Sequence, residues 1–95
     1  MRTYQLSDQA EADLIRIHQY GIRKYGIAKA DKYFKAFFEH FEKLAENPYS
    51  YPSVGHIRQS YRRSICGIDN VYYRINGNNV EIMSIIGRQK TETWL

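Results

Sequence analysis

Arginine side chains gather in a stretch of the sequence that contains no carboxylate. Between Glu46 and Asp69 lie Arg58, Arg62 and Arg63. A guanidinium group can bind a carboxylate or a phosphate through two parallel hydrogen bonds, so such a cluster favours an anionic partner. RNA, DNA and an acidic protein segment fit it equally well. Ordinary solvated strand charge is the alternative, because isolated surface ion pairs contribute little.

Other side chains that support catalysis or metal binding are scattered. His18, His40 and His56 are far apart, and no two lie one helical turn apart on the same helix, so we expect no metal. His56 alone lies near the arginines, and it would need an orienting partner to act as a base. Cys66, the single cysteine, is more typical of a small buried residue than of a nucleophile. The sequence therefore predicts neither a metal nor another cofactor.

Length and composition predict one compact domain over residues 1–95, with 43% apolar residues to form a core. A single cysteine excludes an intrachain disulfide, and the sequence shows no signal peptide and no long apolar run. We therefore expect a cytoplasmic protein with no membrane partner. The net charge of +4 is uneven, since residues 1–48 hold 8 basic and 7 acidic groups and residues 49–95 hold 6 and 3. This distribution predicts a basic patch in the second half.

Two helices are predicted in the first half. A short strand ends with Tyr4-Gln5-Leu6, and Ser7 is a suitable N-cap for a helix with acidic residues in its first turn. Gly26 is expected to end this helix, because glycine adopts a left-handed conformation without steric cost. An amphipathic pattern restarts at Ala28 and ends at Asn47-Pro48, since the residue before proline disfavours helical geometry.

Three strands are predicted in the second half. After a loop over residues 49–56, residues 57–66, 69–75 and 79–86 can pair as an antiparallel meander, with turns at Gly67-Ile68-Asp69 and Asn76-Gly77. The last strand is apolar on both faces, so we expect it in the centre of the sheet. The predicted fold is α+β with the order β-α-α-β-β-β, in which a two-helix hairpin packs on a small antiparallel sheet.

Motifs that match a known family occur through nearly the whole chain. The helical half contains Leu6-Ser7-x-x-Ala10-x-x-Asp13-Leu14-x-x-Ile17-x-x-Tyr20, Gly26-x-x-x-Ala30-x-x-Tyr33 and Leu44-Ala45-x-Asn47-Pro48. The sheet half contains Tyr61-Arg62-Arg63, Val71-Tyr72-Tyr73-Arg74-Ile75 and Val80-Glu81-Ile82 leading to Ile86-Gly87-Arg88. In order and spacing these motifs resemble the RelE/ParE superfamily of bacterial toxins from toxin–antitoxin pairs, and most closely its ParE branch.

The resemblance implies one of two activities. RelE-like members cleave messenger RNA on the ribosome with Lys, Arg, Tyr or His side chains and no metal, whereas ParE-like members inhibit DNA gyrase. Aligned by eye, Arg62 takes the place of the first sheet lysine of the RelE branch, but neutral residues take three other cationic positions, namely Ser64, Asn70 and Gln89. Arg88, next to the last of these, could restore one charge. A serine and an amide cannot supply the positive charge that a developing dianionic phosphorane requires. We therefore expect a gyrase inhibitor, and the RelE-type endonuclease is the alternative.

The resemblance also implies the partners. A cognate ParD-like antitoxin is expected to neutralise the toxin in a hetero-oligomer, and operator DNA would be bound only through that antitoxin. The candidate antitoxin-binding residues are Arg58, Arg62, Arg63, Tyr73 and Arg74. The candidate gyrase-binding residues lie near the end of the chain, where cations adjoin apolar side chains: Arg88, Lys90, Trp94 and Leu95. No residue is assigned a catalytic role.

Overall fold

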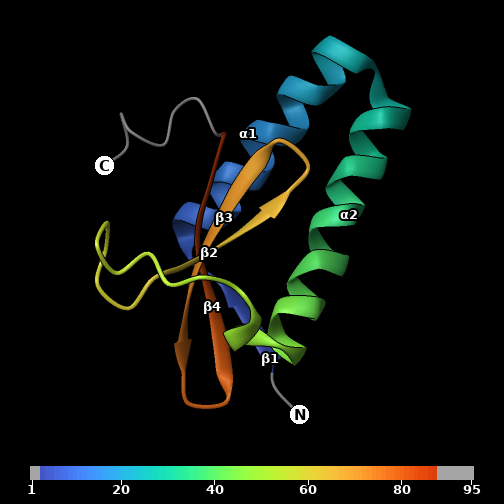
Figure 1. The fold of residues 1–95 in the computed structure, drawn as a ribbon. Helices are drawn as coiled ribbons and strands as arrows, with labels where there is room; N and C mark the ends of the chain where they lie inside the picture. Colours follow the sequence, from blue (N-terminus) through green and yellow to red (C-terminus); the bar gives the residue numbers. More distant parts are fainter. Residues whose placement is uncertain (1–2, 88–95) are drawn as a thin grey trace.

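The computed structural model describes residues 3–87 and contains four strands and two long helices (Figure 1). In chain order these are β1 (Thr3–Leu6), α1 (Asp8–Tyr25), α2 (Ile27–Glu46), a short 3-10 helix η1 (Pro48–Ser50), β2 (Arg62–Cys66), β3 (Asp69–Asn76) and β4 (Asn79–Gly87). The predicted β-α-α-β-β-β order and the α+β class are confirmed. Neither helix in this part of the chain is long and apolar enough to cross a membrane.

The sheet has the strand order β1-β4-β3-β2. Strands β2, β3 and β4 form the predicted antiparallel meander, and β4 lies in the interior of the sheet as expected. Strand β1, however, pairs with β4 in parallel, with Leu6 opposite Ile82, so the sheet is mixed rather than wholly antiparallel. The helical hairpin that follows β1 carries the chain to the far side of the sheet, where β2 forms the opposite edge.

Local signals set the ends of helix α1. The Ser7 side chain accepts a hydrogen bond from the Ala10 amide at 3.0 Å, which satisfies one of the free amides of the first turn. Gly26 follows the last turn with φ at +89°, and its amide donates to the Ile22 carbonyl. Both predicted boundaries are therefore confirmed, and α2 begins directly after Gly26.

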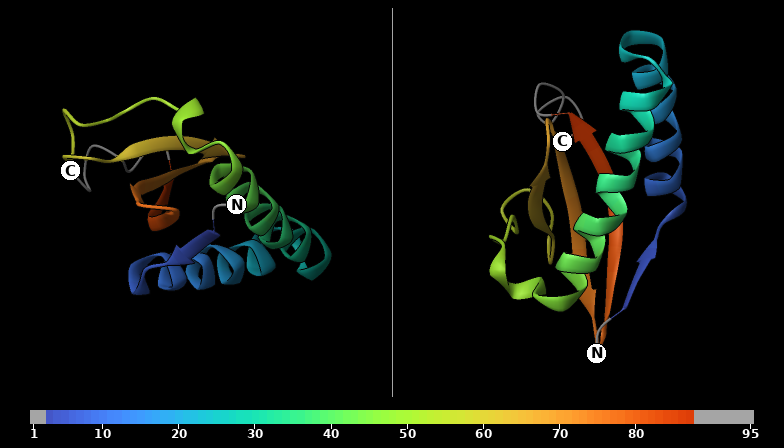
Figure 2. Two further views of the ribbon diagram at one scale, coloured as in Figure 1. Left: turned by 90° about the horizontal axis from the view of Figure 1, so that it is seen from below. Right: turned by 90° about the vertical axis from the view of Figure 1, so that its right-hand side faces the viewer.

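Helix α2 contributes the aromatic part of the core. Phe37 and Phe41 are fully buried against the sheet, and each such side chain stabilises the fold by roughly 1.5–3 kcal/mol. Tyr33 packs edge-on against Phe37 with ring centres 4.8 Å apart, and Phe41 contacts Tyr4 of β1. Figure 2 shows the hairpin of α1 and α2 on one side of the sheet, where this core forms.

The other face of the sheet is covered by the loop over residues 51–61. Val54 and Ile57 of this loop pack with Tyr72 and Ile86 in a second, smaller cluster. Residues 57–61 were predicted to begin a strand, and this prediction is wrong. They form successive turns instead, and Ser60 adopts a left-handed conformation with φ at +68°. The apolar side chains that suggested a strand are explained by the contact of the loop with the sheet.

Candidate functional site

The two adjacent arginines of β2 lie on opposite faces of the sheet, as the twofold period of a strand predicts. Arg62 pairs in register with Tyr73 of the helix-side core, and Arg63 pairs with Tyr72 of the opposite face. The Arg62 guanidinium donates to the Tyr51 carbonyl at 2.6 Å and lies 5.1 Å from the centre of the Tyr49 ring. Arg62 therefore holds the segment after η1 against the sheet.

Tyr73 was a candidate for antitoxin binding, and the structure corrects this assignment. Its side chain is fully buried, and its hydroxyl donates to the Pro48 carbonyl at 2.6 Å. Burial raises the pKa of Tyr73 to about 12, although the nearby Arg62 opposes this. Tyr72 is also fully buried, so both tyrosines of this pair belong to the packed interior and neither offers a surface to a partner.

Three of the predicted antitoxin-binding arginines lie on or near the face opposite the helices. Arg63 pairs with Tyr72 there, and the Arg58 guanidinium lies 6.0 Å from the centre of the Tyr61 ring. Arg74 forms an ion pair with Glu81 of β4 at 2.8 Å, and both side chains are partly exposed, so solvent screens the pair. We call Arg58, Arg63 and Arg74 the outer arginines. Arg58 and Arg74 are exposed, and Arg63 is half-buried.

Ser64 and Asn70, two of the neutral positions that align with RelE cations, are buried. Ser64 is 2% exposed, and its hydroxyl lies 2.6 Å from Nε2 of His40 on α2. Burial lowers the pKa of His40, and the neighbouring Lys43 lowers it further, so the imidazole is neutral at physiological pH. Asn70 is 4% exposed, and Gln89 lies outside the described residues. This buried serine and histidine pair therefore provides no cation for a phosphoryl group.

The serine and aspartate of the first helical motif hold the edge of β4 beyond the end of β1. Ser7 donates to the Met83 carbonyl at 2.8 Å, and Asp13 accepts from the Ile85 amide at 2.9 Å. Arg16 donates to the Ile85 carbonyl at 3.2 Å and lies 3.5 Å from Asp13. These side chains replace a neighbouring strand, and an edge bonded in this way cannot pair with a foreign strand. The sequence did not reveal this role.

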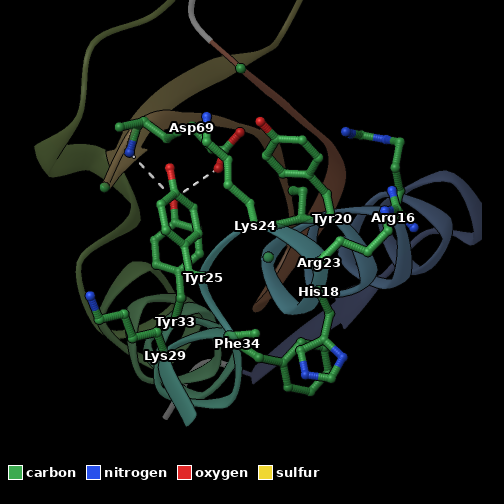
Figure 3. Close-up of a pocket in the computed structure, with 16 residues that line it drawn as sticks. Arg16, His18, Tyr20, Arg23, Lys24, Tyr25, Lys29, Tyr33, Phe34 and Asp69 are labelled. Atoms are coloured by element: carbon green, nitrogen blue, oxygen red, sulfur yellow. Dashed lines mark hydrogen bonds between the residues drawn. The ribbon is translucent and has the colours of Figure 1, made fainter. Parts of the chain in front are cut away.

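A groove of about 670 Å³ lies at the far end of the helical hairpin (Figure 3). The last turns of α1, the first turns of α2, the β2–β3 turn and the end of β4 form its walls. The two helices approach closely there, since a Cβ atom on Gly21 would lie only 3.3 Å from Cβ of Ala30. The groove was not predicted from the sequence, because its walls come from segments far apart in the chain.

Tyr33 fixes the sheet side of the groove. Its hydroxyl lies 2.8 Å from a carboxylate oxygen of Asp69 and accepts from the Ile68 amide (Figure 3). The same hydroxyl lies 2.8 Å from the Cys66 carbonyl. Burial, together with the Asp69 hydrogen bond, raises the pKa of Tyr33 well above its usual range. Burial likewise raises the pKa of the Cys66 thiol to about 11, which makes it a poor nucleophile and agrees with its predicted inert role.

The rim of the groove is strongly basic. Arg23, Lys24 and Lys29 lie around it with Arg16 and His18, and among residues 3–87 the only carboxylate in its lining is the buried Asp69. The Lys24 ammonium lies 5.5 Å from the ring centres of both Tyr20 and Tyr25. The helical half is nearly neutral in sum, but its acidic residues lie elsewhere. No carboxylate occurs between Asp13 and Asp31, so the tip of the hairpin is locally cationic.

The four candidate gyrase-binding residues, Arg88, Lys90, Trp94 and Leu95, lie outside the described residues. They follow Gly87 in the sequence, and Gly87 ends β4 and lines the groove. Their assignment remains a prediction.

The fold is shared with a solved structure. A solved structure described as the chromosomal ParDE TA system from P. aeruginosa superposes with a TM-score of 0.77, covering 92% of this chain and 96% of that chain. The two sequences are 22% identical, so this likeness concerns the fold alone.

Sequence comparison identifies the family. The profile described as "ParE toxin of type II toxin-antitoxin system, parDE" matches residues 4–91. Toxin ParE1 of Caulobacter vibrioides is 34% identical over 86 residues, covering 90% of this chain and 88% of the relative. Toxin ParE1 of Mycobacterium tuberculosis is 25% identical over 84 residues, covering 87% and 86%. This chain belongs to the ParE family of toxins from type II toxin–antitoxin systems.

Proposed function

We propose that this toxin stops growth by binding DNA gyrase, without catalysing a reaction itself, and that a ParD-like antitoxin neutralises it. The match to the ParE family over residues 4–91 carries this proposal. Gyrase acts on DNA in the cytoplasm, so the toxin would act there. The burial of Ser64 and Asn70 supports a binding mode of action, because neither residue offers a cation to a reacting phosphate.

The gyrase contact in this proposal is formed by Arg88, Lys90, Trp94 and Leu95. A large aromatic side chain beside cations is the combination that dominates many interfaces. The antitoxin contact is formed by the outer arginines Arg58, Arg63 and Arg74, while Arg62 supports the surface from within. The complex would be a toxin–antitoxin hetero-oligomer, and it would contact operator DNA through the antitoxin.

Two assays on the purified toxin test the activity. We expect inhibition of supercoiling when the toxin is added to gyrase and relaxed plasmid. We expect no codon-dependent cleavage by primer extension when the same preparation is added to ribosomes and messenger RNA. Cleavage without gyrase inhibition would overturn the proposal and favour the RelE-type endonuclease.

Two variants separate the proposed surfaces. Deleting residues 93–95 should abolish gyrase inhibition and spare antitoxin binding, because the described sheet ends earlier, at Gly87. The matched variant Arg58→Ala/Arg63→Ala should weaken antitoxin binding and leave gyrase inhibition intact. Thermal melting of each variant checks that the fold survives. A truncated protein that still inhibits gyrase fully would place the gyrase contact elsewhere.

A further inference from the structure

The tip of the helical hairpin carries three cations that the rest of the described chain does not neutralise. Arg23, Lys24 and Lys29 are exposed, and among residues 3–87 they form no ion pair. No carboxylate occurs in the sequence between Asp13 and Asp31. We call Arg23, Lys24 and Lys29 the tip cations. An anionic partner can therefore contact all three without displacing an existing ion pair.

Helix stability accounts for only part of this charge. Arg23 and Lys24 lie in the last turn of α1, where the negative end of the helix dipole favours cations. Lys29 lies in the first turn of α2, where the positive end of the dipole disfavours a cation, and that turn contains no acidic residue. A role in binding an anion therefore explains the position of Lys29 better than the stability of its own helix does.

The side chains at the tip are of the types that contact phosphate groups. Lysine, arginine and tyrosine side chains supply many of the contacts between proteins and the backbone of DNA. Tyr20 and Tyr25 are exposed, and the Lys24 ammonium lies 5.5 Å from the centre of each ring (Figure 3). These rings already contact a cation, whereas single strands bind by stacking their bases on aromatic faces. The tip therefore suits the backbone of a duplex better than the bases of a single strand.

The groove beside the tip cations adjoins the proposed gyrase contact. Gly87 lines this groove, and the candidate gyrase-binding residues follow it in the sequence: Arg88, Lys90, Trp94 and Leu95. The outer arginines, which are assigned to the antitoxin, lie on or near the face of the sheet opposite the helices. Gyrase acts on duplex DNA, so that DNA is a polyanion within reach of a toxin bound to gyrase.

We propose that the tip cations bind the phosphate backbone of the duplex DNA held by gyrase, without preference for its sequence. This inference rests on the proposed function, because it adds a DNA contact to the proposed gyrase contact. It differs from operator binding, which is assigned to the antitoxin. Two contacts made at once bind more tightly than either alone, so the toxin should bind the gyrase–DNA complex more tightly than gyrase alone.

Fluorescence anisotropy of a labelled duplex of mixed sequence tests the DNA contact with the purified toxin alone. Affinity for DNA falls with salt according to the number of phosphates that the protein neutralises, and three contacts predict a loss of roughly 40-fold between 50 and 200 mM salt. This salt dependence of the wild-type toxin is the first expected result.

Charge reversal at the tip assigns the contact to its residues. The variant Lys24→Glu/Lys29→Glu should bind the duplex at least tenfold more weakly than the control Lys32→Glu/Lys35→Glu, and the slope of log affinity against log salt should flatten by about 2. All four lysines are exposed and the two variants change the net charge equally, but only the first pair lines the groove. Thermal melting checks that both variants fold.

Binding to gyrase with and without linear duplex DNA tests the contact in the complex. The Kd of the wild-type toxin for gyrase should fall severalfold when the gyrase holds DNA. The variant Lys24→Glu/Lys29→Glu should lose this gain and still bind gyrase alone, whereas the control variant should keep the gain.

The outcomes separate this inference from the proposed function. Equal effects of the two lysine pairs on the salt slope, or a gyrase affinity that DNA does not change, would overturn the DNA inference and leave the proposed function in place. A labelled polyglutamate that binds the wild-type toxin more tightly than the duplex does would assign the tip to an acidic protein and overturn the inference as well. A toxin that binds the duplex but not gyrase would contradict the proposed function and support the phosphate contact alone.

Discussion

Gly67 in the β2–β3 turn provides a sharp test of how the groove is held together. Its φ of +60° lies in the left-handed region, and a Cβ atom built there would lie 2.5 Å from Cε1 and 2.6 Å from the hydroxyl oxygen of Tyr33. Gly77 in the β3–β4 turn has nearly the same φ, +62°, and a Cβ atom there would meet nothing within 4 Å. Gly67→Ala and Gly77→Ala therefore share the backbone penalty and differ in the clash.

The expected magnitudes follow from these two terms. Placing alanine in a left-handed conformation costs roughly 1–2 kcal/mol, which is the whole expected loss for Gly77→Ala. At Gly67 the Tyr33 ring must also swing away, because its outer atoms occupy the space of the new methyl group. The ring would then lose its hydrogen bonds around the turn, at roughly 0.5–1.5 kcal/mol each, and would leave the buried Asp69 without that partner. We therefore expect Gly67→Ala to cost about 3–5 kcal/mol.

Urea denaturation followed by circular dichroism at 25 °C measures both losses. Small domains are stable by only about 5–15 kcal/mol, so the larger loss would bring Gly67→Ala close to unfolding while Gly77→Ala stays folded. A Tyr33→Ala background removes the clash, and there Gly67→Ala should cost no more than Gly77→Ala. Equal losses for the two glycine variants in the wild-type background would refute the reasoning.

Two further predictions concern buried polar groups. Ser84→Ala should keep the free energy of unfolding or raise it by up to about 1 kcal/mol, because the buried Ser84 hydroxyl has no hydrogen-bond partner among residues 3–87. The matched variant Ser64→Ala should lose about 1–3 kcal/mol, because His40 would lose its partner, and urea denaturation that finds equal effects would contradict this. Burial raises the pKa of Asp69 above its ordinary 3.8, so the folded state favours the protonated carboxyl. The stability that this protonation contributes is full below the ordinary pKa and is lost as the pH rises through the folded-state pKa. Asp69→Asn should therefore gain stability relative to wild type at pH 7, and this gain should shrink at pH 4; a gain that grows on acidification would be the opposite result.

Features that depend on local chemistry could be predicted from the sequence. Ser7 and Gly26 mark the ends of α1 because a capping hydroxyl and a left-handed glycine act within one turn of the chain. The Asn76-Gly77 turn is also a local signal, and the observed bounds of β3 and β4 lie within one residue of the predicted ones. The strand predicted over residues 57–61 could not be distinguished from a loop by sequence alone. Ile57 is apolar because it packs against the sheet from the loop, and not because it belongs to a strand.

The candidate site was predicted only in part, because charge and burial depend on the folded arrangement. The net charge summed over the helical half conceals the cationic groove. No carboxylate occurs between Asp13 and Asp31, the interval that forms the tip of the hairpin, and the acidic residues of this half lie outside that interval. The predicted contact surface on the sheet also included a side chain that folding buries. Tyr73 is fully buried with its hydroxyl on the Pro48 carbonyl and cannot reach a partner, whereas Arg62 donates to the Tyr51 carbonyl and stays partly exposed.

The neutral position at Ser64 depends on helix α2 as well as on strand β2. Ser64 does more than lack the charge of a lysine, because the space around it is filled by His40 from α2 at hydrogen-bond distance. The burial and the nearby Lys43 both disfavour a positive charge there, as the lowered pKa of His40 shows. The position is therefore built as part of the helix–sheet contact. A nuclease site at this point would require changes in α2 as well as in β2, because a cation in place of Ser64 would meet the His40 side chain.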